Sequence, residues 1–361
     1  MGVDIKLSDR DLPASPVFID FLHRRITGGA NDASWHDQVS EELVPGDVEK
    51  RIEQARGVAE SVIAHPLGQK VILRSYELFT AMLTGNEAKL KSFHDRFRFI
   101  VVVGCPRHGG TYLTKQLFRA LGHQAETIPN VIAHDGFPDS SPFFFGEGIN
   151  SYTHTMLQTA EYLAMVEEYF GDRQPIDGKI IVPKKATKAA YNGAFFRTVF
   201  GEDAEYFITL RHPLASCIST YEKSGGLPDD GLFRNRSNIE EWARRDLIVS
   251  GIPETEVDRM PYIDAYLGYW RYYHRQLADT GFATVKNLQC VPYGRERLMA
   301  LADQFNRRFG ISNVVEDFQV KQKGDRHRDW MPRADAALHQ IGALWSAQGF
   351  NFPTADLSEG W

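Results

Sequence analysis

One segment constrains the fold of this chain more than any other: the sequence FRFIVVVG at residues 97–104. Its apolar run is nearly continuous and rich in β-branched residues, which is typical of a strand buried on both faces of a parallel sheet. A glycine-rich turn follows, and then TYLTKQLFRALG, in which Leu113, Leu117 and Leu121 share one face of a predicted helix that ends at Gly122. Strand, turn and helix together are the first half of a βα unit.

Three further apolar runs, at residues 179–183, 204–210 and 282–293, each precede a predicted helix. This alternation predicts an α/β fold of three layers with a mainly parallel central sheet, which extends over residues 96–361. Within that domain, residues 222–260 are rich in turn formers and charges, and we expect them to form a lid or an excursion from the sheet.

Residues 1–95 have helical patterns, and we predict that they form a helical N-terminal extension. Ser15 is placed to cap a helix that starts at Pro16. Apolar residues recur at four-three spacing from Val48 to Val62, and a third helix is predicted from about Gly68 to Leu83.

Composition excludes several classes of protein. With 361 residues, of which 43% are hydrophobic, the chain has enough apolar material for a large core. Its formal net charge of −6 argues against general nucleic-acid binding, which needs a net basic face. The three cysteines are too few and too scattered for a disulfide framework or a zinc cluster, so we expect a reducing compartment. The sequence has no secretory signal pattern and no apolar run of bilayer length, which predicts a soluble cytoplasmic protein without a membrane span and leaves open whether it is a homo-oligomer.

The turn after the first strand, Gly104–Thr111, reads GCPRHGGT and opens a helix. In this position, backbone N–H groups and a helix N-terminus bind anions. The nucleotide-triphosphatase P-loop, G-x-x-x-x-G-K-(S/T), agrees with the glycines and the final hydroxyl, but Gly110 stands where that loop has its lysine, and the cation comes earlier, at Arg107. A loop with this cation suits a transferred group of lower charge than a phosphoryl group. The alternative is a structural turn without a ligand.

This turn resembles the 5′-phosphosulfate loop of sulfotransferases that use 3′-phosphoadenosine 5′-phosphosulfate (PAPS), whose pattern is P-(K/R)-S-G-(T/S)-T. Pro106, Arg107, Gly109 and Thr111 match it, whereas His108 and Gly110 replace residues with hydroxyl groups. The resemblance implies that PAPS is the donor, that no metal is required, and that the loop binds the 5′-phosphosulfate. The residues it assigns to this role are Arg107, His108, Gly109, Gly110 and Thr111.

The strand at 204–210 leads into RHPLASCISTY, which is similar to the family pattern R-x-P-x-x-x-x-x-S-x-Y. Arg211, Pro213, Ser219 and Tyr221 match in register. The resemblance implies that Arg211 and Ser219 bind the 3′-phosphate of the nucleotide, and a guanidinium at a strand end does offer phosphate a planar fork. On its own, this arginine would be read as a surface residue.

A third segment, VKQKGDRHRDWMP, resembles the region R-K-G-x-x-G-D-W of the same enzymes. Lys323, Gly324, Asp329 and Trp330 fit it, although the spacing after the glycine is longer than usual. The resemblance implies that Lys323 and Gly324 close over the 3′-phosphate. A solvated charged loop is the alternative.

The resemblance also implies a catalytic lysine after the strand that precedes the 3′-phosphate strand. Lys185 is the first choice and Lys188 the second, because the sequence does not determine the register. For the general base we favour His134, since an unperturbed imidazole titrates near neutrality, with Asp135 or His108 as alternatives.

The resulting hypothesis is a sulfotransferase that moves a sulfuryl group from PAPS to a hydroxyl or amine of a small-molecule or glycan acceptor. The aromatic residues Phe143–Phe145 and the segment at 224–240 are expected to line the acceptor pocket. One rival is a P-loop kinase or hydrolase, which would need a lysine before Thr111 and an acidic strand end in place of Arg211. The other is a catalytically silent nucleotide-binding protein.

Overall fold

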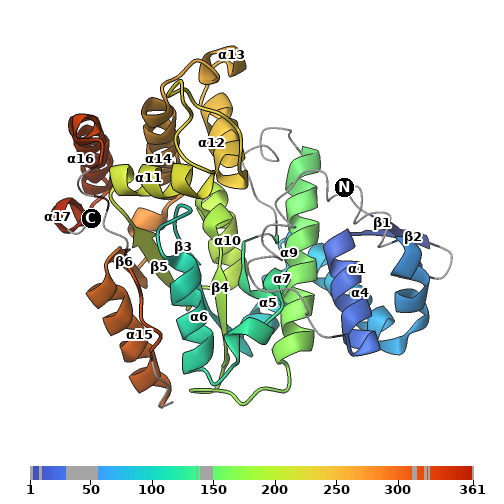
Figure 1. Cartoon of the computed structure of the whole chain (residues 1–361). Coiled ribbons are helices and arrows are strands. Elements are labelled where there is room, and N and C mark those ends of the chain that lie inside the picture. Colours follow the sequence, from blue (N-terminus) through green and yellow to red (C-terminus); the bar gives the residue numbers. More distant parts are fainter. Residues whose placement is uncertain are drawn as a thin grey trace.

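The computed structural model describes residues 3–7, 10–29, 56–135, 137–138, 149–310, 315–320, 323 and 326–359. Four parallel strands form its central sheet, in the order β4-β3-β5-β6 (Figure 1). They are β3 (Phe97–Val103), β4 (Ile180–Lys185), β5 (Glu205–Leu210) and β6 (Leu288–Pro292). Because Val102 pairs with both Lys185 on β4 and Phe207 on β5, the segments that follow these strands emerge at one edge of the sheet.

Two layers of helices cover the sheet, because successive side chains of each strand point to opposite faces. Ile100 and Val102 pack with α6 (Gly110–Ala120) and α15 (Arg295–Phe309) in one apolar cluster. Phe99 and Val101 belong to a second, larger cluster that includes α9 (Ile149–Phe170), α10 (Gly193–Phe200) and α14 (Tyr262–Asp279). The predicted α/β fold with a parallel sheet is therefore confirmed.

The described helices of the main domain that follow α6 include one long helix, α9, and several that surround the carboxyl end of the sheet. They are α7 (Asn130–Ala133), α9 (Ile149–Phe170), α10 (Gly193–Phe200), α11 (Pro213–Lys223), α12 (Asn238–Val249), α13 (Glu254–Val257), α14 (Tyr262–Asp279), α16 (Met331–Ala347) and α17 (Thr354–Glu359). Short 3-10 turns lie at η1 (Ala125–Thr127), η2 (Thr187–Asn192), η3 (Phe282–Thr284) and η4 (Arg328–Trp330).

The segment at 222–260, expected to be a lid or excursion, contains α12 and α13 and packs on α14 through α12. Glu240 on α12 is fully buried and accepts a hydrogen bond of 2.8 Å from the Tyr262 hydroxyl. The buried face of α14 carries aromatic side chains, and their rings are part of the core.

None of the described helices combines the length and hydropathy of a membrane-spanning segment.

The N-terminal segment departs from the helical prediction at its start. Two antiparallel strands, β1 (Val3–Leu7) and β2 (Arg10–Ala14), pair with each other, so the helical prediction is wrong there. Helices follow as predicted: α1 (Pro16–Thr27), a helical stretch at 56–64, α4 (Pro66–Thr84) and α5 (Glu87–His94). The rest of the helix predicted from Val48 lies outside the described residues.

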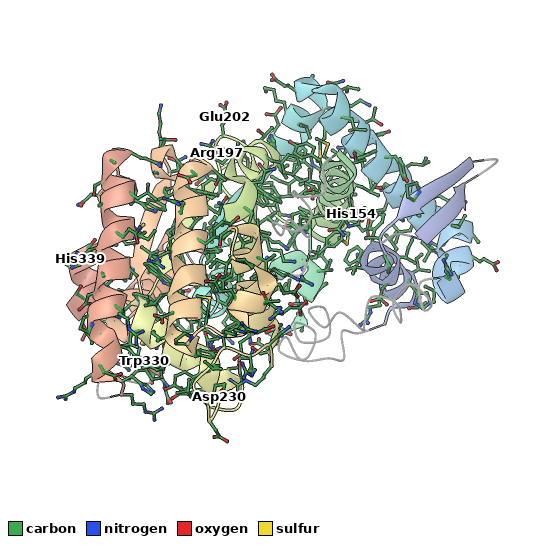
Figure 2. All side chains as sticks on the ribbon, turned by 90° about the horizontal axis from the view of Figure 1, so that it is seen from above. His154, Arg197, Glu202, Asp230, Trp330 and His339 are labelled. Atoms are coloured by element: carbon green, nitrogen blue, oxygen red, sulfur yellow. The ribbon has the colours of Figure 1, made fainter. Side chains whose placement is uncertain are left out.

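The N-terminal helices share their core with the main domain. Phe18 of α1 and Phe99 of β3 belong to one continuous apolar cluster, and α9, which carries His154, lies between the N-terminal helices and the rest of the molecule (Figure 2). The fully buried Glu161 of α9 accepts hydrogen bonds from both the backbone N–H and the hydroxyl of Ser15, at 2.8 and 2.5 Å. Burial raises the pKa of Glu161 to about 8. The division into an extension and a main domain stays a prediction.

Candidate active site

The loop between β3 and α6 has the backbone of an anion-binding turn. Arg107 and Gly109 adopt positive φ angles of 71° and 89°, and α6 starts at Gly110 without a side-chain cap. A Cβ at Gly104 would lie 2.1 Å from Thr209 Oγ1, so only glycine lets the loop leave the sheet this close to β5. Because the first N–H groups of a helix have no intrahelical acceptor, the N-terminus of α6 favours an anion.

Lys185 supplies a second cation, close to Gly110, the position at which a P-loop has its lysine. It is the last residue of β4, and a Cβ placed on Gly110 would lie only 3.2 Å from its Cε atom. A larger residue at position 110 would therefore crowd this lysine. The positive charge that a P-loop carries on its own lysine reaches the start of α6 from the neighbouring strand instead.

Lys185 and Thr111 converge on His134, which follows α7. The His134 Nε2 atom lies 3.3 Å from Thr111 Oγ1 and 3.4 Å from Lys185 Nζ. An ammonium group can only donate, so Nε2 is the accepting, unprotonated nitrogen of the ring in this arrangement. The imidazole is 5% exposed. An unprotonated ring nitrogen in this position is chemically able to take a proton.

Asp135, the alternative base, is fully engaged in the structure. It forms an ion pair with Lys185 and accepts hydrogen bonds from the backbone N–H and the hydroxyl of Thr187. Burial by itself raises the pKa of Asp135, but the charge of Lys185 and these hydrogen bonds outweigh it, and the pKa lies well below its usual range. A carboxylate held this way is a poor base. The structure contradicts that alternative, and Asp135 orients Lys185.

Lys184, to which the sequence assigns no role, anchors the segment that carries His134. Its buried Nζ donates to three carbonyl oxygens, at 3.2 Å for Val131, 2.6 Å for His134 and 2.6 Å for Phe137. The group also lies 4.4 Å from the centre of the Tyr162 ring. Because side chains alternate along a strand, Lys184 and Lys185 leave β4 on opposite faces. Lys184 binds the backbone of the segment that carries His134, whereas Lys185 contacts the His134 side chain.

Lys188, the second choice for the catalytic lysine, lies further along the chain in η2. Its Nζ is 5.3 Å from the centre of the Trp242 ring, and it borders the same small cavity as Asp135 and Lys185. Lys185 is thus the lysine of this run that the structure brings to both His134 and α6.

His108 points into the core and does not face the loop's concave side. It is 1% exposed, and its ring nitrogens contact the Thr209 carbonyl at 3.1 Å and the Ser216 hydroxyl at 3.0 Å. Burial lowers the pKa of His108 well below its usual value. The alternative of His108 as the base is therefore wrong. The ring thus holds the loop to β5 and α11, and the backbone N–H donates to the Cys105 carbonyl at 3.3 Å within the loop itself.

The predicted 3′-phosphate residues meet the same loop. Arg211 is 4% exposed, and its Nη1 donates to the Arg107 carbonyl at 3.2 Å while its guanidinium lies 4.0 Å from the centre of the Tyr293 ring. Its buried Nε atom has no hydrogen-bond partner among the described residues. Burial lowers the pKa of Arg211. The Ser219 hydroxyl accepts a bond of 3.2 Å from Arg107 Nε, so both arginines and this serine form one group.

The third sequence segment is attached to the same helix, α11. Lys323 is buried and forms an ion pair with Glu222, which Arg326 also contacts. Glu222 follows Ser219 by three residues on α11, so the two share a face of the helix. Gly324 lies outside the described residues, as do Phe143–Phe145.

Two members of that segment stack near α11. Trp330 lies parallel to the His327 ring at 3.9 Å, and His327 Nε2 is 3.1 Å from the Tyr221 hydroxyl. Asp329 is part of η4. Lys323 contacts α11 at Glu222, and Trp330 is linked to α11 through His327 and Tyr221.

Lys223 is a cation of this site that the sequence analysis missed. Burial lowers its pKa, and the charges of Arg107 and Lys185 lower it further, which places this lysine within electrostatic reach of both. The sequence feature that could have indicated this lysine is its position, four residues after Ser219 and on the same face of the same helix. Among the described residues, no group of three or more His, Cys, Asp or Glu side chains is arranged to hold a metal ion.

The comparisons with known proteins add little to this geometry. No protein-family model and no curated protein matches the chain. Among solved structures, it is similar to the sulfotransferase domain from the Synechococcus PCC 7002 olefin synthase, with 12% sequence identity and a TM-score of 0.32, over 72% of this chain and 97% of that domain. The fold is defined by the four-stranded parallel sheet and the helices that cover it.

Proposed function

We propose that this protein transfers a sulfuryl group from PAPS to a hydroxyl or amine of a small-molecule or glycan acceptor. One observation carries the proposal: the buried Arg211 guanidinium has no described hydrogen-bond partner at Nε and is joined to the anion-binding loop through the Arg107 carbonyl. Buried charges in proteins are normally paired. This guanidinium is joined through Arg107 to Ser219 and to the loop before an uncapped helix, and it fits a phosphate group of a ligand.

The two ends of the donor would be held by different groups. The 5′-phosphosulfate would be bound by Arg107, Lys185, Thr111 and the first N–H groups of α6. The 3′-phosphate would be bound by Arg211 and Ser219, with Lys323 beside them. Adjacent parallel strands present both groups at one edge of the sheet, which suits a ligand with an anion at each end.

The bound donor supplies an activated sulfuryl group, whose S–O bond to the 5′-phosphate is the bond that breaks. As a new bond forms from sulfur to the acceptor oxygen, or to the nitrogen of an amine, His134 Nε2 takes the acceptor's proton, and adenosine 3′,5′-bisphosphate (PAP) leaves. Arg107 and Lys185 offset the negative charge that develops on the leaving phosphate. Asp135 holds Lys185 in place, and Lys184 holds the backbone of His134.

The kinase alternative needs a direct test, because Lys185 brings a cation to the start of α6. The purified protein is incubated with PAPS labelled in its sulfuryl group, or with ATP labelled in its γ-phosphate, together with a panel of phenols, alcohols, sugars and amines. We expect transfer of the sulfuryl label alone. Transfer of the phosphate label, or of neither label with any acceptor, would contradict the proposal.

Two variants separate binding from proton transfer. Arg107→Ala should lower transfer by about 100-fold or more with an unchanged circular dichroism spectrum. His134→Gln should lower kcat by a similar factor and leave PAP affinity within about threefold of that of the wild type. The matched control is His339→Gln, an exposed histidine of α16 (Figure 2), which should change neither quantity. Normal turnover in Arg107→Ala would refute the loop assignment.

A further inference from the structure

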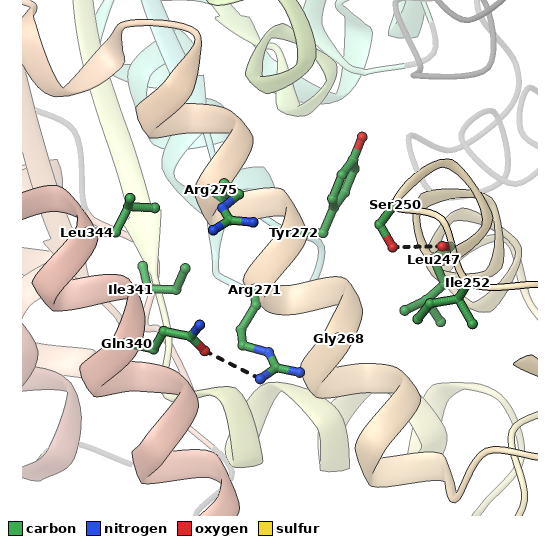
Figure 3. A pocket seen from close by; sticks show the side chains of 10 residues that line it. All are labelled: Leu247, Ser250, Ile252, Gly268, Arg271, Tyr272, Arg275, Gln340, Ile341 and Leu344. Atoms are coloured by element: carbon green, nitrogen blue, oxygen red, sulfur yellow. Dashed lines mark hydrogen bonds between the residues drawn. The ribbon is translucent and has the colours of Figure 1, made fainter.

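A pocket of about 490 Å³ opens between α12, α14 and α16 (Figure 3). It shares no residue with the candidate active site, and its volume lies in the range of small-molecule sites. The absence of a side chain at Gly268 lets α12 approach α14 closely there, since a Cβ at that position would lie 2.8 Å from Leu247 Cδ2.

Much of the pocket wall is apolar. Leu247 and Ile252 come from α12 and the turn that follows it, and Ile341 and Leu344 face them from α16. These side chains offer an aliphatic surface from two sides of α14 (Figure 3). Burial of an alkyl chain against such a surface is favourable, and the gain grows with each methylene group.

The charged part of the wall is entirely basic. Arg271 and Arg275 are exposed and lie one turn apart on α14, and both reach toward the side of the pocket that α16 forms (Figure 3). Arg271 Nη1 contacts the Gln340 side-chain oxygen at 3.3 Å, and no aspartate or glutamate is among the residues that line the pocket. Like charges at this spacing repel each other on a helix, so a bound anion would stabilise the pair.

We propose that this pocket binds an aliphatic carboxylate of medium chain length. The two guanidinium groups would hold the carboxylate, which matches their planar donor fork, and the alkyl chain would lie on Leu247, Ile252 and Leu344. The site is independent of the proposed sulfuryl transfer. It assigns a second ligand, an amphipathic anion, to a face of the molecule that carries no donor-binding residue.

Isothermal titration calorimetry of the full-length protein with decanoate, below its micelle concentration, tests the proposal. Two further ligands separate the contributions of charge and chain: acetate has the charge without the chain, and decyltrimethylammonium has the chain with the opposite charge. We expect saturable binding of decanoate alone. No saturable binding of decanoate, or equal binding of the cationic surfactant, would overturn the proposal.

Variants locate the site. The double substitution Arg271→Gln/Arg275→Gln should weaken decanoate binding by at least about tenfold, since it removes both charged donors. Leu344→Asn should weaken it by about threefold or more, because it makes the wall polar. Arg297→Gln on α15 is the matched control and should leave the affinity unchanged. Equal affinity of the double variant and the wild type would place the ligand elsewhere and refute the assignment.

Discussion

Substitution of Arg211 by methionine should separate ligand binding from stability. In the unliganded protein, this buried guanidinium makes one hydrogen bond to the Arg107 carbonyl and a cation–π contact with Tyr293. Its Nε atom lacks a described partner, and burial lowers its pKa, which means that the fold disfavours its charge. Arg211→Met keeps most of the side-chain volume and removes only the charge and the donors.

The magnitudes follow from these contacts. The hydrogen bond and the cation–π contact are worth about 2–4 kcal/mol together, whereas the desolvation of a buried ion costs several kcal/mol. We therefore expect the free energy of unfolding without nucleotide to stay within about 1 kcal/mol of the wild-type value, or to rise. Loss of a buried charge partner from a bound phosphate should cost about 2–5 kcal/mol, so PAP affinity should fall by at least about 30-fold.

Urea unfolding and calorimetric titration measure the two quantities. Adenosine 5′-monophosphate, which lacks the 3′-phosphate, is the control ligand, and its affinity should change by less than about threefold. Arg297→Met, an exposed arginine on α15, is the control variant. Two results would refute the reasoning: equal losses for both nucleotides, or a large loss of stability with no change in PAP affinity.

Three further predictions concern residues around the site and the core. Glu222→Gln removes the carboxylate that pairs with two cations next to the 3′-phosphate group, so PAP affinity measured by calorimetry should rise by about three- to tenfold; a fall would show that the carboxylate supports binding. Lys184→Met leaves three buried carbonyl oxygens without their donor and loosens the backbone of His134. The kcat for sulfuryl transfer should therefore fall by about tenfold or more at unchanged PAP affinity. A selective loss of PAP affinity would contradict this role. Glu161 keeps its proton in the folded state up to about pH 8 but loses it near pH 4.5 when unfolded, so the free energy of unfolding should fall by about 1 kcal/mol per pH unit between these values. In urea unfolding, Glu161→Gln should abolish this part of the dependence of stability on pH. An unchanged dependence would show that Glu161 is ionised in the folded protein.

The parallel sheet could be predicted because each of its strands is a short apolar run followed by turn formers. The N-terminal strand pair could not. Its second strand, RDLPA, contains an aspartate and a proline, which are both depleted in strands, and its backbone pairs with β1. A pattern within one strand carries no information about such a partner.

In the candidate site, sequence patterns located the anchors but not their side-chain directions. Lys184 and Lys185 are the last two residues of β4, and the register of the strand determines which face of the sheet each side chain leaves from. A shift of the register by one residue would exchange the positions of the two lysines. His108 stands in the loop motif as a donor, yet Thr209, Ser216 and His274 together enclose its ring. Those three residues follow it by more than 100 positions, so no local pattern indicates its burial.

Calorimetric titration of the wild-type protein with PAP tests the central claim most directly, with adenosine 5′-monophosphate and adenosine 3′-monophosphate as the comparison ligands and with the chelator EDTA present throughout. Because Arg107 and Arg211 belong to one connected group, we expect PAP to bind with a micromolar or lower Kd and each monophosphate to bind at least about tenfold more weakly. No measurable binding of PAP, or equal affinity for all three nucleotides, would contradict the account.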